Sequence, residues 1–301
     1  MSGWWSTTDL DVFLARVGAF LHSRPAAHTL PLSVTDALRH RGLHAFGDGD
    51  PVFGALERAG AVEAVFVRTP PWPLHVTALP EPDADAAALA AHLAAEGLDP
   101  SGVTADRATA AAFAAAWERR TGAAARVDKQ QRLYRLAELA VPEPAPAGGP
   151  RVAAAGDRAL LARWFTEFGE AVGESAPADA GAWADARLAY GGVTLWETPD
   201  GTPVAMAGVT RLIAGQVRVA PVYTPADLRG RGYAGAVTAE VSRSALAAGA
   251  GEVLLFTDLA NPTSNALYQR IGYRPVADFT VWEFDTAAED AARDVTATAA
   301  P

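Results

Sequence analysis

The sequence predicts a mixed α/β fold in two tandem halves, each with a central mixed β-sheet flanked by helices. Half of the 301 residues are apolar, which is enough for two globular domains with cores of their own. The stretch VPEPAPAGGP at Val141–Pro150 is typical of a semi-rigid linker and divides the chain almost evenly. Helical and strand patterns alternate in the second half, and the first half repeats part of that order.

The second half predicts the element order β-α-α-β-β-β-α-β-α-β. A short strand at 151–155 precedes helices at 157–172 and 179–190, the first of which starts at an Asp suited to N-capping. Residues 193–224 form three strand-like runs broken by PDG and AG, a pattern typical of an antiparallel meander. The remaining elements are a helix at 236–248, a strand at 252–259, a helix at 261–271 and a strand at 274–284.

The first half contains a similar series. Strand patterns at 61–70 and 73–80 precede helical patterns at 85–97 and 106–122, and a closing strand pattern covers 125–139. In both halves a helix with an aromatic residue near its end stops at a Gly before a long strand, as in AAAWERRTG and NALYQRIG. We interpret this as a degenerate structural repeat, with two unrelated α+β domains as the alternative.

We therefore expect domains at 1–145 and 146–285, followed by a flexible tail at 286–301. The tail has one Val as its only large apolar residue, which is too little to join a core. Because the first half has no Gly/Arg cluster between a strand and a helix, we expect it to bind no phosphate there.

The composition limits the chemistry and the partners of the chain. There is no cysteine, which excludes disulfides, thiolate nucleophiles and Cys-ligated metals, and all six histidines lie in the first third. Proton transfer in the second half must then use a carboxylate, a tyrosine or water, and we expect no metal site. The net charge of −10 argues against general nucleic-acid binding.

No stretch reaches the roughly 20 apolar residues that span a bilayer, and the N-terminus has no basic segment followed by an apolar core. We therefore expect a cytoplasmic protein that has no membrane partner. Its oligomeric state, monomer or homodimer, stays open at this point.

The segment VYTPADLRGRGYAGAVTAEV, at 222–241, concentrates three glycines and two arginines in seven residues between a strand and a helix. Backbone amides at a helix N-terminus commonly hold an anion, most often a phosphate. The string GRGYAG also matches a dinucleotide-binding fingerprint, with Asp258 ending the next strand. However, six residues separate it from the strand end, and about 70 remaining residues are too few for a doubly wound sheet. A simple Gly-rich turn would not account for Arg229 and Arg231.

The string RGRGYA resembles the R/Q-x-x-G-x-G/A signature of the GCN5-related N-acetyltransferases, the GNAT superfamily. The later NPTSNALYQRIGY resembles the second signature of that superfamily, an Asn-led helix ending in Y-x-x-x-G-[FY]. The two motifs occur in the family's order, and the likeness covers roughly 146–285. The resemblance implies a tandem GNAT fold, with a catalytic second half and a degenerate GNAT-like first half.

The resemblance also implies acetyl-CoA as co-substrate and a set of residues that bind it. The strand Val217–Tyr223 would splay from the next parallel strand and open a slot for the pantetheine arm. One main-chain amide of this strand end would polarise the thioester carbonyl. The implied contacts to the pyrophosphate and the pantetheine arm are Val222, Tyr223, Thr224, Arg229, Gly230, Arg231, Gly232, Tyr233, Ala234, Gly235, Asn261 and Ser264.

The family reaction is direct attack of an amine on the acetyl thioester. Tyr268 stands where the family has its general acid, and the alternative is a tyrosine packed in the core. The general base stays open among Glu167, Glu170, Glu174, Glu197 and water. The side chains of Trp183, Trp196 and Trp282 are candidates for lining an acceptor pocket, although a core position is the default for tryptophan.

We thus expect an acetyl-CoA-dependent N-acetyltransferase that acts on an unidentified small-molecule amine, with a first half that is a candidate wall of the acceptor site. The acidic net charge favours a cationic acceptor through steering. Three alternatives stay open: a non-catalytic acyl-CoA-binding or sensor module, an acyltransferase that uses a longer acyl donor, and transfer to a hydroxyl acceptor.

Overall fold

The computed structural model describes residues 3–173 and 179–285. The predicted tail at 286–301 and the candidate base Glu174 lie outside the described residues. By its contacts the chain divides into two compact units, the first made of Met1–Gln131 and Ala277–Pro301 and the second of Arg132–Val276. Within the described ranges, no helix is long and apolar enough to cross a bilayer.

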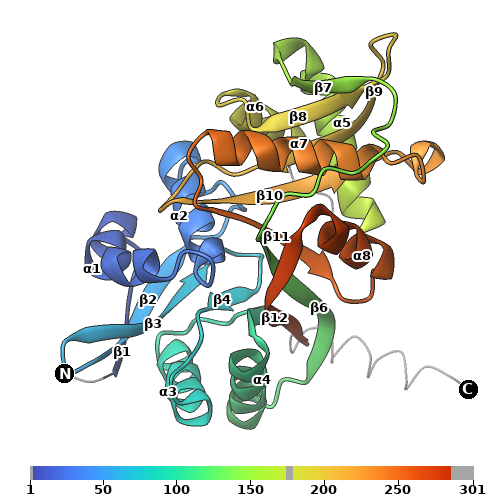
Figure 1. Cartoon of the computed structure of the whole chain (residues 1–301). Helices are drawn as coiled ribbons and strands as arrows, with labels where there is room; N and C mark the ends of the chain where they lie inside the picture. Colours follow the sequence, from blue (N-terminus) through green and yellow to red (C-terminus); the bar gives the residue numbers. More distant parts are fainter. Residues whose placement is uncertain (1–2, 174–178, 286–301) are drawn as a thin grey trace, which may run out of the picture. The chain divides into compact units, whose positions relative to one another are not determined.

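Unit 1 combines a mixed sheet with four helices (Figure 1). Neighbouring strands are antiparallel along β1, β2, β3 and β4, whereas β4 and β5 are parallel. Beyond β5 the sheet continues with Phe279–Glu283 of β12, which pair antiparallel with β5. The elements of this unit are β1 (Gly3–Thr7), α1 (Leu10–Ser23), α2 (Thr29–Arg41), β2 (Val52–Arg58), β3 (Ala61–Arg68), β4 (Leu74–Val76), α3 (Pro82–Ala95), β5 (Gly102–Asp106) and α4 (Arg107–Thr121).

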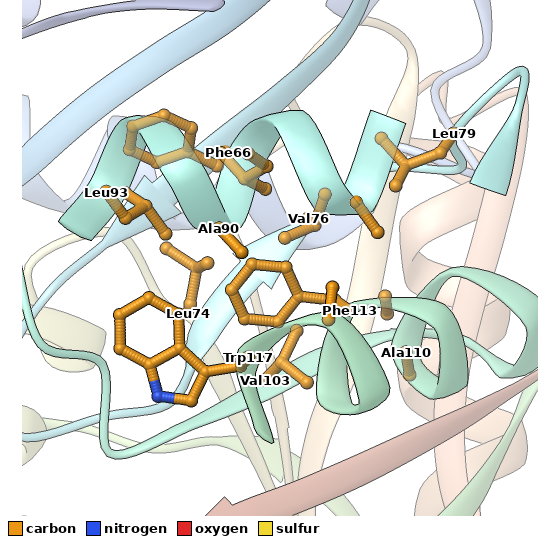
Figure 2. Close-up of a cluster of buried hydrophobic side chains, with 14 of the residues drawn as sticks. Phe66, Leu74, Val76, Leu79, Ala90, Leu93, Val103, Ala110, Phe113 and Trp117 are labelled. Carbon is orange, nitrogen blue, oxygen red and sulfur yellow. The ribbon is translucent and has the colours of Figure 1, made fainter. Parts of the chain in front are cut away.

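The core of unit 1 lies between the sheet and the helices α3 and α4. Figure 2 shows Phe113 and Trp117 of α4 facing Leu93 of α3 across strand residues such as Leu74. Phe113 is fully buried and stacks on Trp117 with ring centroids 6.0 Å apart. The helix α4 is held at both ends by local chemistry, because Asp106 caps its first amides and Gly122 ends it in the left-handed conformation.

Unit 2 has the element order that the sequence predicted for the second half, which confirms the expected α/β fold. The strands β7 to β10 are antiparallel neighbours, and β10 runs parallel to β11. The elements are β7 (Gly149–Val152), α5 (Arg158–Ala171), α6 (Ala180–Leu188), β8 (Val193–Glu197), β9 (Pro203–Val209), β10 (Gln216–Tyr223), α7 (Tyr233–Ala247), β11 (Glu252–Asp258), α8 (Pro262–Ile271) and the start of β12 (Tyr273–Phe284).

Helices cover both faces of the unit 2 sheet (Figure 1). One apolar cluster joins α7 and α8 to residues such as Ala205 and Val219. A second cluster joins α5 and α6 to Leu195, Met206 and Tyr223. Because successive strand residues point to opposite faces, Ala205 and Met206 serve different clusters. The sheet is therefore a middle layer with a helical layer on each side.

Two long strands explain why the boundaries between the units do not coincide with the linker at Val141–Pro150. The strand β6 (Ala125–Leu136) starts in unit 1, but its Tyr134 is fully buried in the α7/α8 cluster of unit 2. The strand β12 starts in unit 2 and ends beside β5 in unit 1. Each unit thus contains chain from both halves. The division of the chain at 145 and 285 stays a prediction.

We predict that Phe113→Ala will destabilise unit 1 by about 3–5 kcal/mol, because it leaves a cavity where a fully buried ring packs. Chemical denaturation followed by tryptophan fluorescence will measure the change. The control is Val12→Ala, since Val12 is 51% exposed on α1 and its removal should change the free energy of unfolding little. Equal effects of the two substitutions would contradict the packing described for α4.

Candidate functional site

The strands β10 and β11 part after three pairs of residues. Gln216, Val217 and Arg218 pair with Glu252–Leu254, and although both strands continue, no further residues of the two strands pair within the described part of the chain. On its other edge β10 stays paired with β9 up to Tyr223. A slot therefore opens between β10 and β11 just beyond Arg218. Its edges are main-chain N–H and C=O groups that form no hydrogen bonds between these two described strands.

A β-bulge turns β10 where this slot begins. Val219 pairs with Val209 and Val222 pairs with Ala207, so that three steps along β10 match two along β9. Gly208 lies opposite the bulge, where an added Cβ would stand 2.6 Å from the carbonyl oxygen of Ala220. The close approach of β9 to the bulge therefore requires glycine at 208.

The Gly/Arg segment forms the turn between β10 and α7. A short 3₁₀ turn at Ala226–Leu228 leads to Gly230 and Gly232, whose φ values of +77° and +86° are ones that glycine adopts readily. Gly232 precedes α7 and offers no side chain to cap the helix. The first helix amides have no carbonyl one turn earlier to bind, and no described side chain takes them up. The turn thus presents a group of unpaired N–H donors.

The two arginines of this turn keep their charge available. Nε of Arg229 donates to the carbonyl of Thr224 at 3.1 Å, and Nη2 of Arg231 donates to the carbonyl of Asp227 at 3.1 Å. Both side chains are exposed, and neither makes an ion pair with a carboxylate of the described chain. These hydrogen bonds stabilise the turn without neutralising the two guanidinium groups. The remaining positive charge favours binding of an anion at the start of α7.

The linker contributes to the same region, which no sequence pattern predicted. A Cβ on Gly235 would lie 3.1 Å from Leu267 of α8 and 3.5 Å from Pro142. A Cβ on Gly232 would lie 3.9 Å from Pro146. Gly235 therefore permits close packing of α7 on α8, and the prolines of the linker run past the start of α7.

Tyr268 points into unit 2 from α8. It is 8% exposed, packs edge-on against Tyr273 at 6.1 Å, and no described residue hydrogen-bonds its hydroxyl. Burial raises the pKa of Tyr268 to about 12. A phenol of this kind is protonated at neutral pH and has a proton to donate.

The second predicted motif starts α8. Asn261 is exposed, and its Oδ1 accepts a hydrogen bond from the amide of Ser264 at 3.0 Å, so that it caps the helix. The neighbouring Asn265 binds the carbonyls of Asp258 and Asn261 through Nδ2. Its Oδ1 accepts from the hydroxyl of Tyr134 at 2.9 Å. These bonds fix the start of α8 beside the end of β11.

The glutamates differ in how they are held. Glu167 of α5 accepts a hydrogen bond from the hydroxyl of Tyr223 at 2.8 Å. Burial and this bond to Glu167 raise the pKa of Tyr223 to about 12. Glu197 is bound by Arg151 at 2.6 Å, whereas Glu170 lies exposed on α5. Glu167 is thus the only described candidate base in contact with a predicted binding residue.

The three tryptophans lie in apolar clusters. Trp183 stacks on Phe165 with centroids 4.1 Å apart, and Trp196 packs in the α7/α8 cluster. Trp282 packs against the core of unit 1. All three tryptophans therefore pack in or against apolar clusters, as is usual for tryptophan.

Comparisons with known proteins agree with this architecture. Residues 202–282 match a family model described as FR47-like protein. A GCN5-related N-acetyltransferase from Sphaerobacter thermophilus is 19% identical, with a TM-score of 0.60 over 93% of this chain and 95% of that one. A GNAT-family acetyltransferase from Colwellia psychrerythraea is 13% identical, with a TM-score of 0.57 over 93% and 98%.

A tandem GNAT protein from the clavulanic acid biosynthesis pathway is also similar, with 13% identity and a TM-score of 0.58 over 95% of this chain and 98% of that one. A search of curated proteins finds no match. At these identities the solved structures show the fold. The tandem GNAT fold that the two motifs implied is confirmed.

We predict that Gly208→Ala will destabilise unit 2 by about 1–3 kcal/mol, because the new methyl meets the carbonyl of Ala220 across the bulge. Thermal unfolding will measure the shift in Tm. Gly149→Ala in β7 is the matched control, since a Cβ there meets nothing within 4 Å. A Tm shift of the same size in both variants would contradict the close approach at the bulge.

Proposed function

The chain has the tandem GNAT fold and carries an FR47-like domain at residues 202–282, and on this basis we propose that it is an acetyl-CoA-dependent N-acetyltransferase. Its reaction would transfer the acetyl group directly to the amine of a small molecule. The observation that carries the proposal is the open edge of β10 next to the unpaired amides that start α7.

The donor set fits the chemistry of acetyl-CoA. A pyrophosphate needs several N–H donors and positive charge, and the stretch Arg229–Gly235 offers both. A pantetheine arm carries amides that pair with strand edges, and Val222–Thr224 supply such an edge. Asn261 and Ser264 at the start of α8 are the proposed further contacts.

The chemistry supplied by the co-substrate is an acetyl group on a thioester. In the proposed transfer, the amine nitrogen bonds to the acetyl carbon, the carbon–sulfur bond breaks, and the electron pair of that bond stays on the sulfur. Tyr268 gives its phenolic proton to the departing sulfur, which its protonated state at neutral pH permits. A main-chain amide in Val222–Thr224 stabilises the negative charge that develops on the carbonyl oxygen.

The amine must lose a proton before or during attack, and water or Glu167 takes it. Glu167 is favoured over Glu197 because Arg151 binds the carboxylate of Glu197 at 2.6 Å, whereas the ion pair of Glu167 with Arg163 is longer, at 3.7 Å. Glu167 also contacts the hydroxyl of Tyr223, whose main chain belongs to the proposed slot. The proton then returns to Tyr268 through solvent, which restores the starting state.

The test of the proposal is calorimetric titration of the full chain with acetyl-CoA, followed by an assay of coenzyme A release across a panel of small amines. We predict binding and turnover in the wild type. Gly232→Ala should weaken acetyl-CoA binding at least about tenfold, because a side chain disfavours the left-handed turn that aims the amides. The matched control is Gly201→Ala, which has a similar φ of +82° in a distant hairpin.

Each outcome decides between the open alternatives. Binding without turnover on any amine would favour a sensor module, and faster release from propionyl-CoA or butyryl-CoA would favour a longer acyl donor. No binding of acetyl-CoA would reject the proposal altogether.

For Tyr268→Phe we predict that kcat falls about 100-fold or more while the Kd for acetyl-CoA stays unchanged. With a pKa near 12, the wild-type phenol should cause no loss of kcat on the alkaline side below about pH 10. Tyr273→Phe is the matched control, because its hydroxyl bonds only to Ser242 in the core. An unchanged kcat in Tyr268→Phe, with chemistry shown to limit the rate, would exclude the acid role.

A further inference from the structure

Three arginines gather on the α5/α6 face of unit 2 without a carboxylate partner. Arg187 belongs to α6, Arg211 follows β9, and Arg218 belongs to β10. Several other arginines of the described chain are paired with Asp or Glu, as Arg151 is with Asp157. Within the described ranges, no ion pair involves Arg187, Arg211 or Arg218.

The position of Arg218 relates the cluster to the slot. Arg218 is the last residue of β10 that pairs with β11, so the slot begins at the next residue. Its neighbours Val217 and Val219 pack in the α7/α8 cluster, and its side chain therefore points to the opposite face, which α5 and α6 cover. Thr210 pairs with Arg218 through main-chain and hydroxyl hydrogen bonds, so the next residue, Arg211, lies near Arg218.

Part of the Arg218 guanidinium is buried without a partner. Its Nη1 has no hydrogen-bond partner, although the atom is shielded from solvent. Burial, with a contribution from the charge of Arg187, lowers the pKa of Arg218 to about 10, so the group is still charged at neutral pH. A buried charge without a partner is costly, and two like charges in proximity add to that cost. This arrangement is stabilised when an anion enters.

Aromatic rings and one carbonyl hold the other two arginines. Nη1 of Arg187 donates to the carbonyl of Val209 and to the hydroxyl of Tyr190, which itself donates to the same carbonyl at 2.8 Å. Cζ of Arg211 lies 4.4 Å from the centre of the Tyr190 ring. Such contacts orient guanidinium groups without neutralising them. The cluster is therefore held in place by these contacts and keeps its positive charge.

We propose that Arg187, Arg211 and Arg218 bind the carboxylate of the acceptor, so that the acceptor is an amino acid or a related amine bearing an acid group. The proposal rests on the proposed acetyltransferase function, because it assigns a substrate class to that same site. An oxyanion held beside Arg218 places the rest of its molecule at the opening of the slot, where the acetyl group is transferred. Arginine is suited to this role through its paired, parallel N–H donors.

The first test compares matched acceptors with the purified full chain and acetyl-CoA. Glycine, β-alanine and larger α-amino acids are each paired with the amine that lacks the carboxylate, such as methylamine for glycine. We expect kcat/KM for the best acid to exceed that of its neutral partner by about 100-fold or more. Aminomethylphosphonate is a further arm, and a preference for it would assign the cluster to a phosphonate or phosphate group and overturn the carboxylate.

The second test uses substitutions. Arg218→Gln and Arg211→Gln should each raise KM for the acid acceptor about 10- to 100-fold, and so reduce the preference for the acid over its neutral partner by a similar factor. Arg243→Gln on α7 is the control, because that arginine is exposed and paired with Glu240. Arg211 is half-buried and stacks on a ring, so its variant keeps the test valid if Arg218→Gln fails to fold.

A third measurement does not depend on turnover. Calorimetric titration with the N-acetylated form of the best acid, in the presence of coenzyme A, should show binding that Arg218→Gln or Arg211→Gln weakens. If acetyl-CoA binds and neutral amines are acetylated as well as acids, the carboxylate site is overturned while the acetyltransferase function stands. If acetyl-CoA does not bind, the function itself fails.

Discussion

The site of unit 2 depends on one interruption, the loss of pairing between β10 and β11 after Arg218. Main-chain groups at the centre of a sheet are normally paired, and unpaired ones are costly away from water. The strand β10 nevertheless keeps its extended conformation, because β9 pairs with its other edge and the side chains of β10 pack on both faces of the sheet. Val222 contacts the α7/α8 cluster and Tyr223 contacts the α5/α6 cluster. The slot is therefore a rigid opening in a packed sheet.

The two ends of this opening carry positive charge of different kinds. At the outer end, Arg229 and Arg231 bind carbonyls of their own turn and stay exposed, so their charge is screened by solvent. At the inner end, Arg218 is buried next to Arg187, where a charge interacts more strongly. In the proposed complex, acetyl-CoA places its phosphate groups near Arg229 and Arg231. The end of the slot near Arg218 is then available to the amine acceptor.

The sequence was informative where chemistry and structure are local. The turn at Gly230 and Gly232 and the cap at Asn261 are each specified within a few residues, so their motifs predicted both the fold and a candidate site. The elements before residue 61, namely α1, α2, β1 and β2, were not predicted, although Asp9 caps the start of α1 with its own side chain. The arginine cluster was also missed, because its members are far apart in sequence and meet only in the folded chain, through the pairing of Thr210 with Arg218 and the contacts of Arg187 and Arg211 with Tyr190.

Net charge and the local charge at the slot favour different acceptors. The chain has a charge of −10, which taken alone favours a cation. However, Arg218 lies where the slot begins, and in the part of the chain that the structure describes neither it nor its neighbours Arg187 and Arg211 pair with a carboxylate. In the proposed complex the acceptor carboxylate satisfies these arginines, while the nearby positive charge disfavours the ammonium form of its amine. The nucleophile thus loses its proton more easily, which reduces the demand on a general base. A site without histidine can then rely on Glu167 or water.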